Sequence, residues 1–208
     1  MGYPLGVLPN YTRHPTELAL KIKEKRLSWS GDDFTIRDAM TETPIFRVNG
    51  KTFTWHGRQQ LVDAQGAPLM DISFEPMHFV HSVFNGHDPV TKERLFRIRS
   101  KVSFGANLII TFQNKCGPYA GREMELSLKG DFFAREATIQ YDGAVIARID
   151  RKFWNSRQFI FDQQSYILTV GPGVDIAFMV ALCLCLDQLR DDGGAPANGV
   201  GAVIDLAL

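Results

Sequence analysis

The chain of 208 residues is long enough for one large all-β domain or two small ones, and it can bury a sizeable core. It is 45% hydrophobic and 22% charged, which is ordinary for a globular protein, and 23 basic residues balance 23 acidic ones. The balanced charge gives no argument for nucleic-acid binding, so any anion site has to come from a local patch.

The cysteines and the first residues indicate an intracellular protein. Three cysteines are too few for a disulfide framework, and Cys183 and Cys185 are expected to be small core residues. The first ten residues lack the basic segment and the apolar run of a signal peptide. We therefore expect reduced thiols and a cytoplasmic location, with peripheral membrane association left open.

The first elements of the chain are an arm and a basic segment. Residues 1–15 are rich in Pro and Gly and are predicted to form an irregular N-terminal arm. Residues 19–28 have the composition of a basic helix, but Leu20 and Ile22 alternate strictly with lysines, which fits a strand. We favour the strand, and its outer face would carry Lys21, Lys23 and Lys25.

The middle of the chain reads as many short strands. Three segments, 35–46, 62–70 and 138–149, share one pattern: a strand, a turn that contains Asp or Gly, and an apolar strand. Many short strands at near-regular spacing predict a barrel or a sandwich. Five dipeptides are interpreted as turns, because such pairs tolerate positive φ: Asn49-Gly50, Gln65-Gly66, Asn85-Gly86, Lys129-Gly130 and Asp142-Gly143.

One strand of this region is the best candidate for a binding site. Arg97, Arg99 and Lys101 would share one strand face, opposite an apolar face of Phe96 and Ile98. Cations about 7 Å apart on a rigid strand suit the phosphates of an inositol headgroup, and the lysines at 21, 23 and 25 form a second such stripe. The alternative is a solvated outer face whose charges pair with acidic neighbours.

No pattern in the sequence indicates catalysis or a bound metal. His78 and His81 would face opposite sides of a strand, which weakens a shared site with His87. No nucleophile elbow or phosphate loop is present, so we expect neither an enzyme nor a cofactor.

The last strong element is an apolar helix over residues 174–189. A final strand, 165–170, ends at Gly171-Pro172-Gly173, and from Ile176 to Leu186 the helix is apolar on every side. Such a helix lies in a core or in a membrane. About 16 residues span roughly 24 Å, short of the roughly 30 Å of a bilayer, so we predict a buried core helix and no transmembrane span. Residues 193–208 are predicted to be a flexible tail.

Several of these segments resemble the LURP-one-related family. The resemblance runs in order from about residue 20 to residue 192 and rests on five matching segments: 27–38 (with Ser30-Gly31-Asp32-Asp33-Phe34), 44–50, 128–133, 147–152 and 171–178, followed by Leu186-Asp187. It implies a tubby C-terminal-like fold over residues 16–192, a closed antiparallel β-barrel of about twelve strands around a hydrophobic C-terminal helix.

The resemblance also sets the functional expectation. In the wider superfamily, tubby proteins bind phosphoinositides and scramblases act on lipids, and no agreed catalytic residues come with the family. We therefore expect a non-enzymatic intracellular binding or adaptor module whose ligand is an anionic membrane lipid or a protein partner. The alternative is a scramblase-like membrane-associated protein that uses its C-terminal helix. The oligomeric state stays open.

Overall fold

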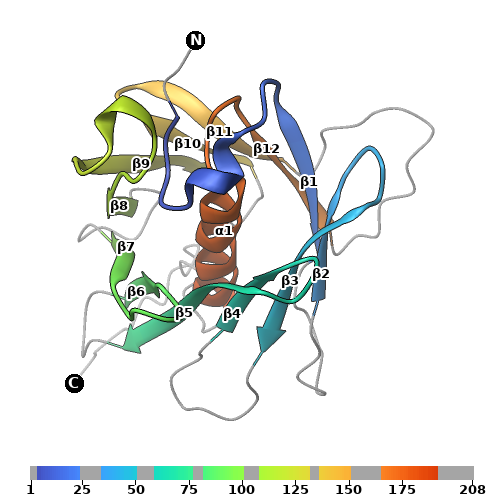
Figure 1. Cartoon of the computed structure of the whole chain (residues 1–208), viewed down its shortest axis with the longest axis horizontal. Coiled ribbons are helices and arrows are strands. Elements are labelled where there is room, and N and C mark those ends of the chain that lie inside the picture. The colour runs from blue at the N-terminus through green and yellow to red at the C-terminus, as the bar shows by residue number, and fades with distance from the viewer. Residues whose placement is uncertain are drawn as a thin grey trace, which may run out of the picture.

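The protein folds as a closed antiparallel barrel around one α-helix (Figure 1). The computed structural model describes residues 4–23, 34–50, 59–76, 82–100, 108–131, 136–150 and 165–191. Its strands are β1 (Leu18–Lys23), β2 (Phe34–Asp38), β3 (Pro44–Gly50), β4 (Gln59–Asp63), β5 (Pro68–Pro76), β6 (Ser82–His87), β7 (Arg94–Ser100), β8 (Leu108–Gln113), β9 (Glu123–Asp131), β10 (Glu136–Tyr141), β11 (Ala144–Asp150) and β12 (Ser165–Val170). Two 3-10 turns, η1 (Pro9–Thr12) and η2 (Gly117–Tyr119), and the helix α1 (Ile176–Asp191) complete it. The predicted fold class is confirmed.

The barrel is an up-and-down ring that closes between its first and last strands. Every strand pairs with its neighbours in the sequence, and β1 closes the ring by pairing with β12, with Leu20 opposite Leu168. Because neighbouring strands are antiparallel, all even-numbered strands end at one rim, which we call the arm end. The N-terminal arm reaches the barrel there, and α1 begins there after β12.

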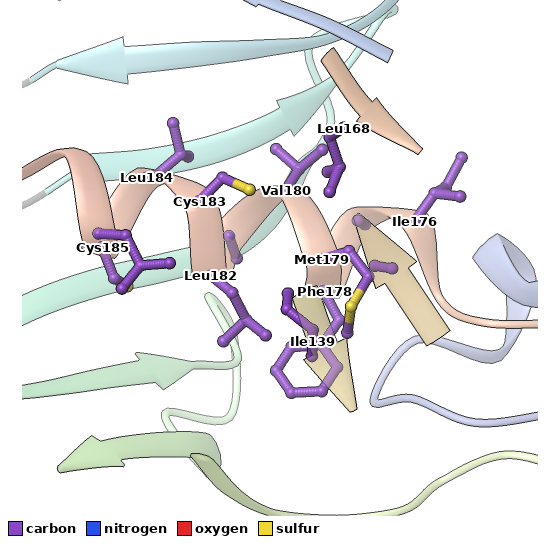
Figure 2. Packing of buried hydrophobic residues seen from close by; sticks show 14 of the residues in the cluster. Ile139, Leu168, Ile176, Phe178, Met179, Val180, Leu182, Cys183, Leu184 and Cys185 are labelled. Atoms are coloured by element: carbon purple, nitrogen blue, oxygen red, sulfur yellow. The ribbon is translucent and has the colours of Figure 1, made fainter. Parts of the chain in front are cut away.

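The helix α1 fills the interior of the barrel, as Figure 2 shows. Its residues from Ile176 to Leu186 are each at most 9% exposed. The ring of Phe178 packs between Phe96 and Phe112, with centroids 5.3 and 4.9 Å away. The barrel wall therefore covers the apolar surface that would otherwise fit a membrane. Each buried aliphatic or aromatic side chain contributes about 1.5–3 kcal/mol to the stability of the fold.

The strands alternate between a core face and an outer face, as the sequence pattern predicted. In β1, Leu20 and Ile22 are buried while Lys21 and Lys23 point outward, so the strand interpretation of this segment is confirmed as far as Lys23. The three predicted repeats are the hairpins β2–β3, β4–β5 and β10–β11. A fourth hairpin, β6–β7, follows the same plan.

Three of the five predicted turns were wrong. Asn49-Gly50 forms the paired end of β3, and Asn85-Gly86 and Lys129-Gly130 lie inside β6 and β9, whereas Gln65-Gly66 and Asp142-Gly143 do form turns. Gly86 is needed for packing and not for a turn, because a Cβ there would overlap the ring of Phe96. A side chain at Gly130 would overlap the backbone of β10.

The predicted bounds of the helix need a small correction. The helix begins at Ile176 and not at residue 174, because the carboxylate of Asp175 accepts a hydrogen bond from the backbone N–H of Phe178 at 3.0 Å and so caps the first turn. Among the described residues no helix is both long and apolar enough to cross a bilayer. The predicted tail, 193–208, lies outside the described residues.

Candidate functional site

The outer face of β7 carries two arginines. Arg97 is half-buried and Arg99 is exposed, while Phe96 and Ile98 point into the core, as predicted. In the paired register Arg97 lies between Asn85 of β6 and Thr111 of β8. Its Nε atom is buried and has no hydrogen-bond partner. Lys101, the third predicted member of this stripe, lies outside the described residues.

The charge of these arginines is not neutralised by the part of the barrel that the structure describes. Neither Arg97 nor Arg99 forms an ion pair with a residue of the described ranges. On the same outer row the nearest carboxylate is that of Glu125, which faces Thr111 from β9. Glu125 is therefore two strands from Arg97, with about 10 Å between their backbones, and no ion pair joins the two side chains. The arginines of β7 therefore do not fit the alternative interpretation, in which the charges of a solvated outer face pair with acidic neighbours.

The stripe on β1 has different surroundings. Lys21 forms an ion pair with Glu42, with Nζ 3.0 Å from Oε1. Arg37 of β2 lies opposite Lys21, and its Nη1 donates to the backbone carbonyl of Glu42 at 3.0 Å. Lys23 is exposed, and Lys25 lies outside the described residues. Lys21 thus fits the alternative interpretation, in which charges on the outer face pair with acidic neighbours.

The two stripes do not form one site. In the ring order of the barrel five strands separate β1 from β7 in either direction. The two strands therefore lie on opposite sides of the barrel, and their outer faces point in opposite directions. A single headgroup, or a flat membrane, can contact only one of them. Spacing along the chain could not reveal this, because it depends on the order of strands in the closed ring.

Of the three histidines that we considered as metal ligands, one lies among the described residues. His87 ends β6, and His78 and His81 lie outside the described residues. Across the ranges that the structure describes, no three His, Cys, Asp or Glu side chains come together as metal ligands. The three cysteines are free thiols in the core, as expected.

Two buried polar residues at the arm end were not singled out as a possible site. Asp175 and Asn114 are fully buried. Burial raises the pKa of Asp175 to about 6, although the N–H groups of Phe178, Leu8 and Val7 donate to its carboxylate and oppose this shift. Burial, and next the nearby Asp175, raise the pKa of Cys116 to about 12. The only signal in the sequence was an acidic residue at the start of a helix, which is common.

Comparison with known proteins identifies relatives along nearly the whole chain. A family model described as LURP-one-related matches residues 18–187. Protein LURP-one-related 15 of Arabidopsis thaliana is 24% identical over 192 residues, covering 87% of this chain and 84% of the relative. Protein LURP1 of the same plant is 24% identical over 200 residues, covering 93% and 94%.

A solved structure supports the fold independently. An X-ray structure of an Arabidopsis thaliana protein superposes with a TM-score of 0.62 at 20% sequence identity. The match covers 88% of this chain and 97% of that protein. At this identity the likeness concerns the barrel and its helix, and it assigns no ligand.

Proposed function

Because this chain belongs to the LURP-one-related family, we propose that it is a non-enzymatic binding module that holds an anionic lipid headgroup on the outer face of β7. The observation that carries the proposal is the pair Arg97 and Arg99, whose guanidinium groups have no acidic partner in the described part of the barrel. Phosphate oxygens are the acceptors that such groups bind best, through paired hydrogen bonds.

The rigidity of β7 favours binding by these two side chains. Both neighbours, β6 and β8, pair with β7 along its length. Arg97 is half-buried between them, so it has already lost part of the rotamer freedom that binding would otherwise cost. Its buried and unpartnered Nε adds a cost, because an unsatisfied buried donor costs about 1–3 kcal/mol. An anion beside the guanidinium would offset part of this cost through charge attraction, without a hydrogen bond to the buried Nε.

The opposite stripe on β1 supplies the matched control. Lys21 and Lys23 also lie on an outer face, but Lys21 is paired with Glu42 and both point away from β7. Removing the same number of positive charges there leaves the β7 face unchanged. The two double variants therefore separate a specific face from a general attraction between net charge and an anionic surface.

The test is sedimentation with liposomes made of phosphatidylcholine, with or without phosphoinositides, at low and at physiological salt. The parent protein is expected to sediment with the phosphoinositide liposomes, and less so at higher salt. R97A/R99A should weaken this partitioning by about 2 kcal/mol, roughly 30-fold, if each cation near the surface contributes about 1 kcal/mol. K21A/K23A should sediment like the parent.

Two outcomes would contradict the proposal. If both double variants lose binding equally, the attraction is a general charge effect. If the parent does not sediment under either salt condition, the lipid proposal is wrong, and pull-down experiments for a protein partner are the next test. The helix α1 gives no support to the scramblase-like alternative, since its apolar residues from Ile176 to Leu186 already pack against the barrel wall.

A further inference from the structure

The N-terminal arm turns across the arm end of the barrel, next to the start of α1 (Figure 1). The backbone N–H of Leu5 donates to the carbonyl of Gly173 at 3.0 Å. The carbonyl of Leu5 accepts from the N–H of Asp175 at 2.8 Å. With these two bonds Leu5 forms a parallel β-bridge with Val174. The arm is thus held by main-chain pairing with the segment between β12 and α1.

The next residue of the arm is held from the opposite side, by the segment that follows β8. The N–H of Gly6 donates to Oδ1 of Asn114 at 2.9 Å. The carbonyl of Gly6 accepts from the N–H of Lys115 at 2.8 Å and from the thiol of Cys116 at 3.3 Å. The amide of Asn114 is itself fixed, because its Nδ2 donates to the carbonyl of Cys116 at 2.8 Å.

The carboxylate of Asp175 completes this main-chain recognition. Its Oδ2 accepts from the N–H groups of Val7 and Leu8, at 3.0 and 2.6 Å. Its Oδ1 accepts from Phe178 of α1 at 3.0 Å. One buried carboxylate therefore serves both the helix and the arm. Four successive residues of the arm, from Leu5 to Leu8, have their N–H groups bound before the arm turns into η1.

The site also restricts which side chains the arm can carry. Leu5 and Val7 enter the core, at 7% and 1% exposure. Gly6 between them has φ 151, and a Cβ there would overlap the side chain of Asp175. The site therefore accepts a segment that bends at a glycine between two aliphatic residues. Backbone bonds for affinity, with pockets for alternate side chains, are a common way in which a protein binds a peptide.

The link between the arm and β1 carries little of this contact. Arg13, Pro15, Thr16 and Glu17 are exposed. His14 is the exception, because its ring nitrogens lie 2.7 Å from the carbonyl of Val174 and 2.8 Å from that of Thr16. Apart from the bond from the N–H of Tyr11 to the carbonyl of Leu8, the bonds that hold residues 5–8 go to segments more than 100 positions away in the chain.

From this geometry we propose that the arm end of the barrel is a peptide-binding site, specific for an aliphatic-Gly-aliphatic segment that bends at the glycine, which the chain's own arm occupies in cis. The occupant in trans is the arm of a second copy of this chain, which carries that sequence. The site is distinct from the β7 face and does not depend on lipid binding.

The test uses the full chain with a protease cleavage sequence inserted between the exposed Thr16 and Glu17. After cleavage the arm is held by non-covalent contacts only. A fluorescent synthetic peptide with the sequence of residues 1–16 should exchange into the cleaved protein with a one-to-one stoichiometry. The uncleaved protein should bind none, because its own arm fills the site.

Two variant peptides test the specificity. A Gly6→Val peptide should fail to bind, since its side chain would overlap Asp175. An Asn10→Ala peptide changes an exposed side chain and should bind like the parent peptide. Equal binding of the Gly6→Val peptide, or binding to the uncleaved protein, would overturn the proposal. So would loss of the β-sheet circular-dichroism signal when the arm dissociates, because the arm would then be part of the core and not a ligand.

Discussion

Asp175 is the residue on which two parts of the molecule depend. Its carboxylate caps α1 and binds the arm, yet it is completely buried. Burial raises its pKa from 3.8 to about 6, so the folded protein binds this proton more tightly than the unfolded chain does. The stability that follows is complete below about pH 4 and is lost as the pH rises through about 6.

Replacement of Asp175 by Asn should remove this pH dependence. The amide keeps one oxygen as an acceptor but does not titrate between pH 4 and 8. Between pH 7.5 and pH 5 the parent should gain about 1.4 kcal/mol more stability than D175N, since one pKa unit corresponds to about that energy. Urea unfolding at the two pH values measures the difference. Parallel pH profiles would show that the carboxylate stays ionised in the folded protein.

At the scale of elements, two hairpins repeat the same turn. In β2–β3, Oδ1 of Asp38 accepts from the N–H groups of Met40 and Thr41, both at 2.8 Å. In β6–β7, Oδ1 of Asp88 accepts from the corresponding residues at the same distances. Both turns also place a non-glycine residue at positive φ, 56 at Glu42 and 60 at Lys92. A single aspartate therefore organises each turn and compensates for its strained residue.

Removal of either aspartate should cost a similar amount. D38A and D88A each leave two N–H groups without their acceptor, and solvent replaces it in part, so we expect a loss of about 0.5–1.5 kcal/mol each. The two turns share no contact partner, so the losses should add in the double variant. Chemical denaturation measures this, with the exposed Glu123→Ala as the control. A double variant no less stable than either single one would show that the turns do not contribute independently.

The turn at Asp88 has a pH dependence opposite to that of Asp175. The N–H groups of Thr91 and Val90 lower the pKa of Asp88. The stability that Asp88 contributes is therefore lost as the pH falls, whereas that of Asp175 is lost as the pH rises. The two effects can be separated only by comparing single variants at each pH.

At the scale of the whole molecule, the barrel and its helix form one core. Leu182 is fully buried in the middle of α1. Leu182→Asp would place a carboxylate in the interior at a cost of several kcal/mol, a large fraction of the 5–15 kcal/mol that usually stabilises a domain. We expect this variant to fail to accumulate as folded protein. Val145→Asp, at a position that is 41% exposed, should melt close to the parent. Parental melting of Leu182→Asp would mean that the helix lies outside the core.

The sequence predicted the elements better than it predicted their arrangement. The helix was recognisable because α1 is apolar on every side, and β1 because Leu20 and Ile22 alternate with lysines. Both signals are local. The wrong turn at Asn85-Gly86 shows the limit of local signals, because that glycine is required by Phe96 on the next strand.

The candidate site was predictable only in part for the same reason. The alternation along β7 correctly placed Arg97 and Arg99 on the outer face. That Lys21 lies on the far side and pairs with Glu42 depends on ring order and on a turn 21 residues away. The docking of the arm could not be predicted, because its partners Asn114 and Asp175 are distant in the sequence and an acidic residue at the start of a helix is common.

The pairing of β1 with β12 has a consequence for how the chain folds during its synthesis on the ribosome. Synthesis proceeds from the N-terminus, so β1 emerges first but waits for its second partner until β12 has left the exit tunnel. The helix that fills the interior follows later still. A nascent or truncated chain that lacks β12 therefore leaves β1 and β11 with unpaired edges, and one that lacks α1 has an unfilled interior; chaperones and proteases recognise both features. Only a chain that has been translated through α1 can bury its full core. A filled barrel therefore indicates that translation has passed the end of α1.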